Sequence, residues 1–541
     1  MSPQISRSSI INKLIPTQGQ TIRPPLFLIV MGAIAAIGMA LPLVYLIIRT
    51  MEIDVEQWWE FLRRRQTLEI ILNSIVMAVV VTLLSALIAI PLAFLTVRTD
   101  LPGRRFWTVV TTLPLAIPTY VGSFALIATF GPRGSLLQSW LAPLGVERLP
   151  SIYGWPGVIA GIALFSYPYM LLSIRAGLQG IDPAMEEAAR SMGYNPWSVF
   201  FRVTLPQLQP SIVAGSLLII LYALRDFGTP SLMRFNSFTR AIFTQYRASF
   251  NLNFAAALSL MLVVLVSIIL LLEYRVRTKA KYYSRDSATQ RKSKPIRLGH
   301  WKWLALAFCS LVTLLCLVLP VVVIIFWLLR ASDPLAVLKS ILPITFNSAW
   351  AAGLAALVST LFALPVAILG VRFPGILTTL IERASYIGFG LPGVVVALTL
   401  VFFGARYSPW LYQTMPMLIF AYLVMFLPQS VGTIRGCLLQ VNPRLEESAR
   451  SLGGTAWQTL RKVTIPLVRP GIISGSALIF LTAIKELPAT LLLSPIGFRT
   501  LAAQIWVATN NAAFIDAAAA SLALLIVCTG LTLLLLSQEL D

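Results

Sequence analysis

Two pairs of ionisable residues lie inside otherwise apolar stretches, where charged side chains are costly and are therefore candidates for function. The first pair is Arg225-Asp226, and the second is Lys485-Glu486, 260 positions later. Carboxylates placed in this way could attract or gate a hard cation, which prefers oxygen ligands. Alternatively, each pair neutralises itself, or the two basic side chains extend outward to water. The residue types alone favour neither interpretation.

Helix-breaking residues follow each pair, in the segments Phe227-Gly228-Thr229-Pro230 and Leu487-Pro488-Ala489-Thr490. Each pair stands about 15 residues beyond the cytoplasmic start of its apolar stretch, or about 22 Å along a helix. In a hydrocarbon core about 30 Å thick, this depth lies in the outer half. Unwound backbone is tolerated there where it lines a polar cavity. The functional hypothesis is that Asp226 and Glu486 face a pathway.

Enzymatic chemistry has little support in the sequence. The single histidine, His300, stands beside Trp301 and Trp303, a combination typical of the membrane interface. The sequence contains no Ser-His-Asp arrangement and no cysteine or histidine spacing typical of metal ligands. It also lacks a Gly-x-x-x-x-Gly-Lys-Ser/Thr phosphate loop. We therefore expect no enzyme and no cofactor bound by this chain, and we assign no metal ligands.

The composition indicates a membrane protein that crosses the bilayer many times. Hydrophobic residues make up 57% of the chain, charged residues only 12%, and the mean hydropathy is +0.82. Apolar stretches long enough to cross a bilayer recur about twelve times. The predicted spans are 25–48, 70–97, 105–131, 155–178, 209–232, 253–274, 303–329, 346–371, 384–404, 412–434, 470–494 and 513–537.

The net charge of +21 reflects membrane topology and not binding to nucleic acid. Lysine and arginine fall in short runs between the spans, mostly in segments predicted to be cytoplasmic. This arrangement predicts that both termini lie in the cytoplasm. Three external arginines, Arg63, Arg64 and Arg65, depart from the rule. We expect nearby acidic residues to offset them on an amphipathic surface helix, namely Glu52, Asp54, Glu56, Glu60 and Glu69.

An internal repeat divides the chain into two halves. Three short motifs of the first half recur 274 positions later, and further along the chain the offset becomes 260. The motifs are Asn73-Ser74 with Asn347-Ser348, Ile90-Pro91 with Leu364-Pro365, and Val97-Arg98 with Val371-Arg372. Six spans per half give both copies the same orientation, so they form a parallel repeat with a pore between them. A secondary transporter of the twelve-span, two-half type would share these features.

The repeat defines the expected domain organisation. The first half covers residues 1–275 with a core at 70–275, and the second covers 303–541 with a core at 346–537. Residues 276–302 form a basic linker, which we place in the cytoplasm. The first span precedes the repeated core, and it is expected to be a peripheral helix outside the core bundle.

A second duplicated motif lies in the predicted cytoplasmic loop after the fourth span of each half. Asp182 or Asn442 is an N-cap, followed by proline at the first helical position. Gly193 or Gly453 permits the positive φ that ends a helix. Within each helix a glutamate and an arginine four residues apart could pair, as Glu186 with Arg190 and Glu446 with Arg450.

The spacing of this motif resembles the cytoplasmic EAA loop of binding-protein-dependent ABC importer permeases. The shared pattern is Glu-Ala-Ala, three residues, Gly, nine residues, an aliphatic residue, any residue, an aliphatic residue and Pro. The second copy has Ser448 where alanine is usual, and Val203 and Val463 replace the usual isoleucine. The matching residues are Glu187, Ala188, Ala189, Gly193 and Pro206 in the first copy, and Glu447, Ser448, Ala449, Gly453 and Pro466 in the second.

The resemblance implies an all-α, multi-pass protein of a bacterial inner membrane with the type I ABC importer permease fold. Each loop would form a coupling helix in a groove of one ATPase subunit, with two copies of that subunit carrying ATP and Mg²⁺. The two glutamates would contact the ATPase, the small residues would allow close approach, and the glycines would set the bend. A periplasmic substrate-binding protein and the lipid bilayer are the other expected partners. Two such loops argue against a secondary transporter.

The tandem layout and the segment 485–493 resemble bacterial iron(III) transport permeases, in which a periplasmic ferric-binding protein delivers the ion. Carboxylates at Asp226 and Glu486 would suit such a hard cation. Permeases of similar layout serve thiamine, and related ones serve polyamines or oxyanions such as sulfate. The sequence therefore predicts an ABC importer permease for iron(III), with thiamine, a polyamine or an oxyanion as the alternatives.

Overall fold

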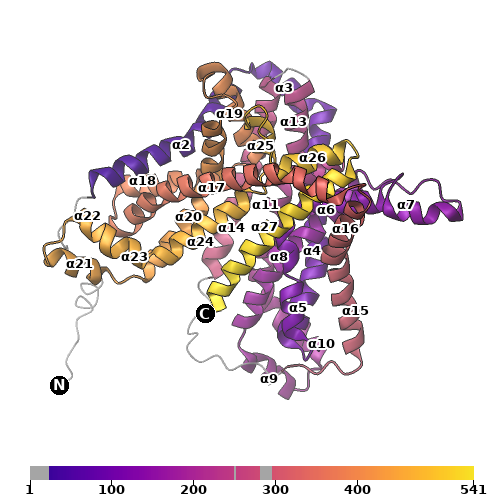
Figure 1. Ribbon diagram of the computed structural model, residues 1–541. Coiled ribbons are helices and arrows are strands. Elements are labelled where there is room, and N and C mark those ends of the chain that lie inside the picture. Colours follow the sequence, from indigo (N-terminus) through magenta and orange to yellow (C-terminus); the bar gives the residue numbers. More distant parts are fainter. Residues whose placement is uncertain (1–23, 249–251, 281–294, 541) are drawn as a thin grey trace, which may run out of the picture.

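Helices form the whole architecture of the computed structural model, which describes residues 24–248, 252–280 and 295–540 (Figure 1). Within these ranges the only β-type pairing is an isolated bridge between Thr99 and Ile296. Nine helices are long and apolar enough to cross a membrane, and three bent helix pairs raise the number to twelve if each pair is one span. The predicted all-α membrane fold is confirmed.

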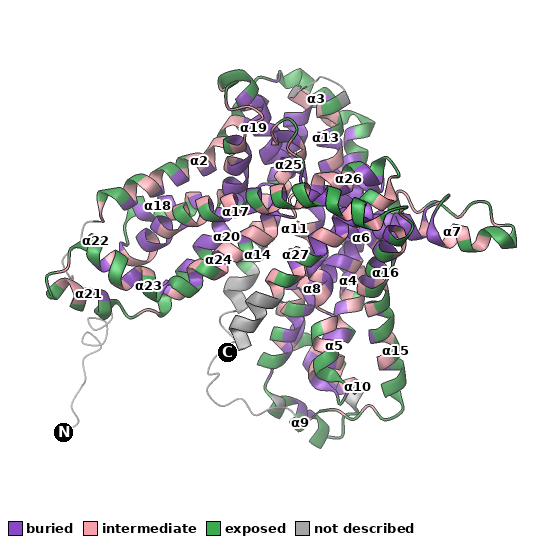
Figure 2. Cartoon of the chain, viewed as in Figure 1, coloured by how far each residue is buried: buried purple, intermediate pink, exposed green. Residues whose placement is uncertain are grey.

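The long helices form because an apolar backbone segment in lipid must satisfy its own hydrogen bonds. Large apolar side chains remain exposed along these helices, and Figure 2 marks exposed residues on α2 and α15 in green. The spanning helices are α2 (Leu26–Met51), α4 (Arg65–Arg98), α8 (Trp155–Gly180), α11 (Leu205–Arg225), α14 (Leu252–Ala280), α15 (Trp301–Thr313) with α16 (Leu319–Leu329), α17 (Pro334–Arg372), α20 (Met415–Gln440) and α27 (Phe514–Leu540).

The third predicted span of each half is sharply bent instead of straight. In the first half, α5 (Arg104–Val110) and a short turn lead into α6 (Thr119–Phe130) at 94°. In the second half, α18 (Ile376–Ser385) leads into α19 (Gly393–Tyr407) at 105°. Pro118 and Pro392 occupy the N-cap positions at these bends, since proline cannot continue the preceding helix.

The fifth predicted span of each half is interrupted as well. Helix α11 ends at Arg225, so the predicted span 209–232 is too long; α12 (Gly228–Leu232) and α13 (Phe238–Ala248) follow. Helix α24 (Arg469–Ala483) meets the preceding helix pair at 68° and ends before Lys485. It is followed by α25 (Pro488–Leu493) and α26 (Leu501–Asn510).

The repeated serines hold these interrupted segments in place. Ser74 on α4 accepts a hydrogen bond from the backbone N–H of Phe238, at the start of α13, at 2.9 Å. Ser348 on α17 accepts one from the N–H of Leu501, at the start of α26, at 2.7 Å. Each serine therefore satisfies one of the free N–H groups at a helix N-terminus. This shared contact gives the repeated Asn-Ser motif a structural role.

The first spanning helix of each half packs against the other half. Helix α2 contacts α17 and α18 of the second half. The α15–α16 pair contacts α4, α6 and α8 of the first half, as well as α27. The first span was expected to be a peripheral helix outside the core bundle; it packs mainly against the opposite half, and α14 is its contact in the first half. Figure 1 shows α2 running alongside α18 and α17.

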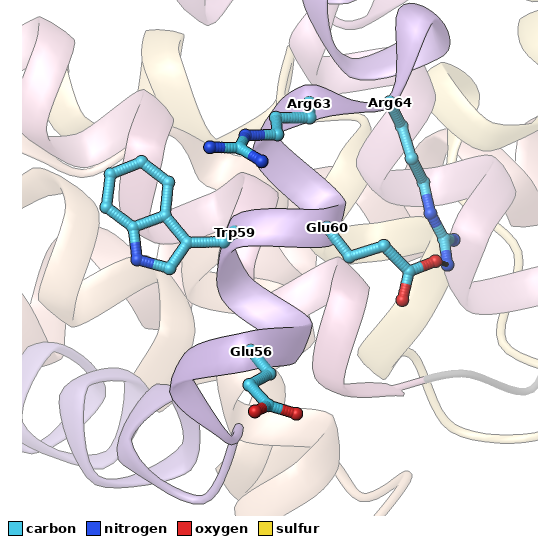
Figure 3. Close-up of a pocket in the computed structure, with 5 residues that line it drawn as sticks. All are labelled: Glu56, Trp59, Glu60, Arg63 and Arg64. Carbon is cyan, nitrogen blue, oxygen red and sulfur yellow. Dashed lines mark hydrogen bonds and ion pairs between the residues drawn. The ribbon is translucent and has the colours of Figure 1, made fainter.

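A short helix, α3 (Val55–Arg63), ends at the first of the three arginines that depart from the charge rule, and Arg64 and Arg65 follow it directly. Figure 3 shows the hollow that its side chains line, with the Glu60 carboxylate directed at Arg64. The Arg63 guanidinium lies 5.8 Å from the centre of the Trp59 ring. The ion pairs here are Arg64–Glu60 at 2.7 Å and Arg65–Glu69 at 2.9 Å. Neighbouring acidic residues therefore offset two of these arginines, as predicted.

The crossing helices predict that the two halves are interdependent. If the chain is cut between residues 280 and 295 and both pieces are co-produced, we expect them to copurify in a near one-to-one ratio. Either piece alone should fail to accumulate, because α2 would keep only α14, and α15–α16 only α27, of the helices they pack against. Affinity purification through a tag on one piece measures this. Recovery of either piece alone as a stable, monodisperse protein would contradict the prediction.

Candidate functional site

The duplicated loop motif folds as the sequence predicts. Helix α9 (Pro183–Ser191) begins after Asp182, whose side chain accepts a hydrogen bond from the N–H of Ala184 at 3.0 Å. Helix α21 (Pro443–Ser451) begins after Asn442, which caps the N–H of Arg444 at 3.0 Å. Gly193 and Gly453 end the two segments with φ of 86° in both copies. The caps and bends predicted for the loop helices are confirmed.

Each loop helix exposes one part of the motif and buries another. Glu187 and Ala188 are exposed and Ala189 is buried in the first copy. In the second copy Glu447 and Ser448 are exposed and Ala449 is half-buried. A glutamate beside a small residue is therefore accessible to a partner on both loops. Figure 1 places α9 and α21 at the ends of two separate arms of the molecule.

The proline that ends each motif follows a π-helical turn. These turns cover Phe200–Thr204 and Leu460–Thr464, and Pro206 and Pro466 come two residues later. Both prolines are exposed. A π turn inside an α-helical segment occurs often at functional sites. Its presence at the same place in both halves shows that the helix is wound in the same way where each loop returns to the membrane.

The glutamate just before each motif glutamate, Glu186 or Glu446, points inward and forms a buried ion pair. Glu186 is 5% exposed, lies 3.6 Å from Arg98 Nη2 and accepts a hydrogen bond from Thr204 Oγ1 at 2.9 Å. Glu446 is 7% exposed, lies 3.1 Å from Arg372 Nε and accepts one from Thr464 Oγ1 at 3.1 Å. This hydroxyl bond is needed because a buried ion pair must offset its loss of hydration.

The predicted pairs within each loop helix, Glu186 with Arg190 and Glu446 with Arg450, are wrong. An exposed pair four residues apart stabilises a helix by only about 0.2–0.5 kcal/mol. The buried partners Arg98 and Arg372 offer stronger attraction in a medium of lower dielectric constant. Sequence reasoning noticed the repeated Val-Arg dipeptide that contains these arginines, but it assigned them no partner.

Each arginine also binds the backbone where its loop begins. Arg98 Nη2 donates to the carbonyl of Ile181 at 3.4 Å, and Arg372 Nη2 donates to the carbonyl of Val441 at 3.1 Å. Arg98 ends α4 and Arg372 ends α17. The same side chain therefore joins a long membrane helix to both the start and the first turn of the loop helix. We call this arrangement the arginine junction.

The end of the predicted basic linker docks beside the first arginine junction. The N–H of Ile296 donates to the carbonyl of Arg98 at 2.8 Å, and the N–H of Asp100 donates to the carbonyl of Ile296 at 3.1 Å. The N–H of Leu298 donates to Asp100 Oδ1 at 2.9 Å. Most of the linker's basic residues fall in 281–294, which lie outside the described residues. The described end therefore ties the connection between the halves to the junction of α4.

The acidic members of the two charged pairs occupy equivalent positions at the bent helices. Asp226 Oδ1 accepts a hydrogen bond from Thr119 Oγ1, at the first residue of α6, at 3.1 Å. Glu486 lies against Gly393, the first residue of α19, where an added Cβ would stand 2.6 Å from Glu486 Oε1. Thr119 and Gly393 are 274 positions apart. Each carboxylate thus lies at a helix N-terminus, the favourable end of the helix dipole.

The basic members of the pairs behave differently from each other. Arg225 crosses between the halves and donates from Nη1 to the carbonyl of Phe389 at 3.0 Å and from Nη2 to that of Leu391 at 3.4 Å. Lys485 lies on the unwound segment before α25. In the part of the chain that the structure describes, neither Asp226 nor Glu486 forms an ion pair within 4.0 Å. Direct neutralisation inside each pair is therefore not what holds these residues.

A second contact between the halves lies next to the first interrupted segment. Trp506 on α26 donates from Nε1 to Ser231 Oγ on α12 at 3.0 Å. Its ring also packs against Phe227 and Phe243. The interrupted segments of both halves therefore meet each other around Arg225 and Trp506. Within the described residues, no group of three or more histidine, cysteine, aspartate or glutamate side chains could hold a metal ion.

Comparisons with known proteins agree with the duplicated architecture. The model of the family described as "Binding-protein-dependent transport system inner membrane component" matches twice, at residues 85–282 and 359–540. An Fe(3+)-transport system permease protein, FbpB 2, of Haemophilus influenzae is 33% identical over 521 residues, which are 95% of this chain and 99% of the relative.

Other relatives are more distant or shorter. A probable ABC transporter permease protein, y4fN, of Sinorhizobium fredii is 26% identical over 82% of each chain. The molybdenum transport system permease protein ModB of Escherichia coli is 32% identical over 29% of this chain and 69% of the relative. The longer matches extend over both halves, whereas the ModB match is shorter than one half.

The arginine junction predicts different outcomes for adjacent glutamates. Glu446→Ala leaves Arg372 buried without its partner and should reduce stability by about 3–5 kcal/mol. Glu447→Ala removes an exposed side chain and should leave the melting temperature nearly unchanged. Thermal denaturation of the detergent-purified chain compares the two variants. Equal melting temperatures would show that the junction contributes little to the fold.

Proposed function

The chain belongs to the family of binding-protein-dependent transport system inner membrane components, and on this premise we propose that it carries ferric iron across the membrane. It is the permease subunit of an ABC importer, and its own part is translocation. Two copies of an ATPase subunit would bind the exposed faces of α9 and α21 and hydrolyse ATP. A periplasmic binding protein would deliver the cargo at the opposite end, and both termini would lie in the cytoplasm.

The observation that carries the iron proposal is the full-length match to a relative named as an Fe(3+) permease. That match covers both halves and therefore includes the fused layout. The chemistry of the charged pairs is compatible with this cargo, because ferric iron is a hard cation that prefers carboxylate and other oxygen ligands. Asp226 and Glu486 supply such ligands where the interrupted segments of the two halves meet.

The arginine junction supports a route by which the ATPases would drive this movement. A displacement of α9 or α21 would be passed through Glu186 or Glu446 to the end of α4 or α17. The junction is buried and hydrogen-bonded in both halves, so it would resist separation while the loop helix moves. Helix α17 runs unbroken for 39 residues from this end, and it also carries Ser348, which holds the start of α26.

An oxyanion is the second candidate cargo. The relatives include permeases named for molybdenum and sulfate, and they match about a third of this chain. Arg225 and Lys485 would suit an anion, whereas the adjacent carboxylates would repel it. Arg225 is already engaged with two backbone carbonyls, which reduces its availability to an anion.

Radiolabelled uptake into cells that lack the chain, and into the same cells with the chain restored, tests the cargo. We expect restored cells to accumulate ⁵⁵Fe(III) in an ATP-dependent manner, with thiamine, sulfate and molybdate uptake unchanged. Iron uptake that is indifferent to the chain would remove the iron assignment and leave the importer architecture intact. Chain-dependent uptake of sulfate or molybdate would select the oxyanion alternative.

Replacing both acidic residues should greatly reduce uptake if they line the route. We expect Asp226→Asn with Glu486→Gln to lower iron uptake at least tenfold, because the charge is lost while the side-chain shape is kept. Glu147→Gln provides a matched control at an exposed external carboxylate. Uptake should be normalised to the amount of folded protein in the membrane. Normal uptake by the double variant would overturn the role of both residues.

A further inference from the structure

We propose that the hydroxyl of Tyr120 acts with Asp226 and Glu486 as a transient binding site for a hard metal cation between the two halves. The inference rests on the proposed function, and it adds a tyrosine from α6 to the two carboxylates. Tyrosine oxygen and carboxylates together form the kind of all-oxygen ligand set that hard cations prefer.

The buried hydroxyl of Tyr120 has no hydrogen-bond partner among the described residues. The side chain is only 4% exposed. Leaving such a group unpaired is destabilising, so an unpaired hydroxyl in a folded protein needs an explanation. Two other buried tyrosines have partners: Tyr167 donates to the carbonyl of Thr111 at 2.6 Å, and Tyr422 lies 2.5 Å from Thr490 Oγ1.

A second unpaired oxygen belongs to the neighbouring carboxylate. Asp226 Oδ1 is held by Thr119, the residue before Tyr120, whereas Asp226 Oδ2 is buried without a hydrogen-bond partner. Tyr120 also packs closely against Gly228, where an added Cβ would stand 2.7 Å from the Tyr120 Cβ. Two neighbouring residues of α6 therefore contact the interrupted segment that carries Asp226. The region contains two oxygen atoms that the protein itself leaves unsatisfied.

The third oxygen donor comes from the other half. Arg225 binds the carbonyl of Leu391, two residues before Gly393, and Gly393 lies against the Glu486 carboxylate. The Glu486 carboxylate therefore lies on the side of the interface that Arg225 joins to the first half, next to Asp226 and the start of α6. The basic residues adjacent to the two carboxylates in the sequence are Arg225 and Lys485.

A single-atom substitution tests this proposal. Tyr120→Phe removes the unpaired hydroxyl and keeps the ring, so the melting temperature should stay the same or rise. Iron uptake per folded molecule should nevertheless fall at least tenfold, while ATPase stimulation by the binding protein persists. Tyr167→Phe is the matched control. It removes a hydrogen-bonded hydroxyl elsewhere, and it should lower the melting temperature without reducing uptake per folded molecule.

The outcomes separate this inference from the proposed function. If the wild-type chain takes up no iron, the proposed cargo fails and the cation site fails with it. If the wild type transports iron and Tyr120→Phe transports it equally well, only the role of Tyr120 is overturned. A fall in uptake accompanied by a fall in melting temperature would assign the hydroxyl a structural role and would also overturn the proposal. Lower uptake with unchanged or higher stability supports the site.

Discussion

The buried attraction between an arginine at the end of a membrane helix and the first glutamate of a loop helix is the interaction on which the rest of the structure depends. Arg98 with Glu186 and Arg372 with Glu446 place charges where hydration is lost, and the threonine hydroxyl and backbone carbonyl around each pair compensate for that loss. Because the pair is enclosed, each loop helix is tied directly to the end of a membrane helix.

Within the membrane-spanning region, a helix N-terminus lies next to a buried carboxylate in each half. Proline bends the third span of each half, and the bend turns a helix N-terminus toward the acidic residue of an interrupted segment. The helix dipole and the carboxylate then stabilise each other. The halves differ in the details: Thr119 donates a hydrogen bond where Gly393 only permits close approach. A duplicated scaffold has thus acquired two unlike sides around one interface.

Local signals in the sequence predicted much of this structure. The length of the apolar stretches predicted the spans. Helix caps and positive φ depend on near neighbours, so the loop helices could be predicted from Asp182, Asn442, Gly193 and Gly453. Contacts between residues far apart in the sequence could not be predicted. The partner of Glu186 lies 88 positions away, and an arginine four positions away looked equally suitable. Hydropathy does not register bends, so Pro118 was counted inside a straight span. The unpaired hydroxyl of Tyr120 depends on tertiary packing alone.

The crossing of α2 to the opposite half has a consequence for the order of synthesis. Helix α2 leaves the ribosome about 300 residues before its partners α17 and α18 exist. Until then its packing face must be covered by lipid, or by a chaperone of the membrane. A uniformly apolar helix is stable in lipid without a protein partner, and α2 has no charged residue before Arg49. Fusion of the halves keeps the late partners tethered to the early helix, which favours their pairing within one molecule over exchange between molecules.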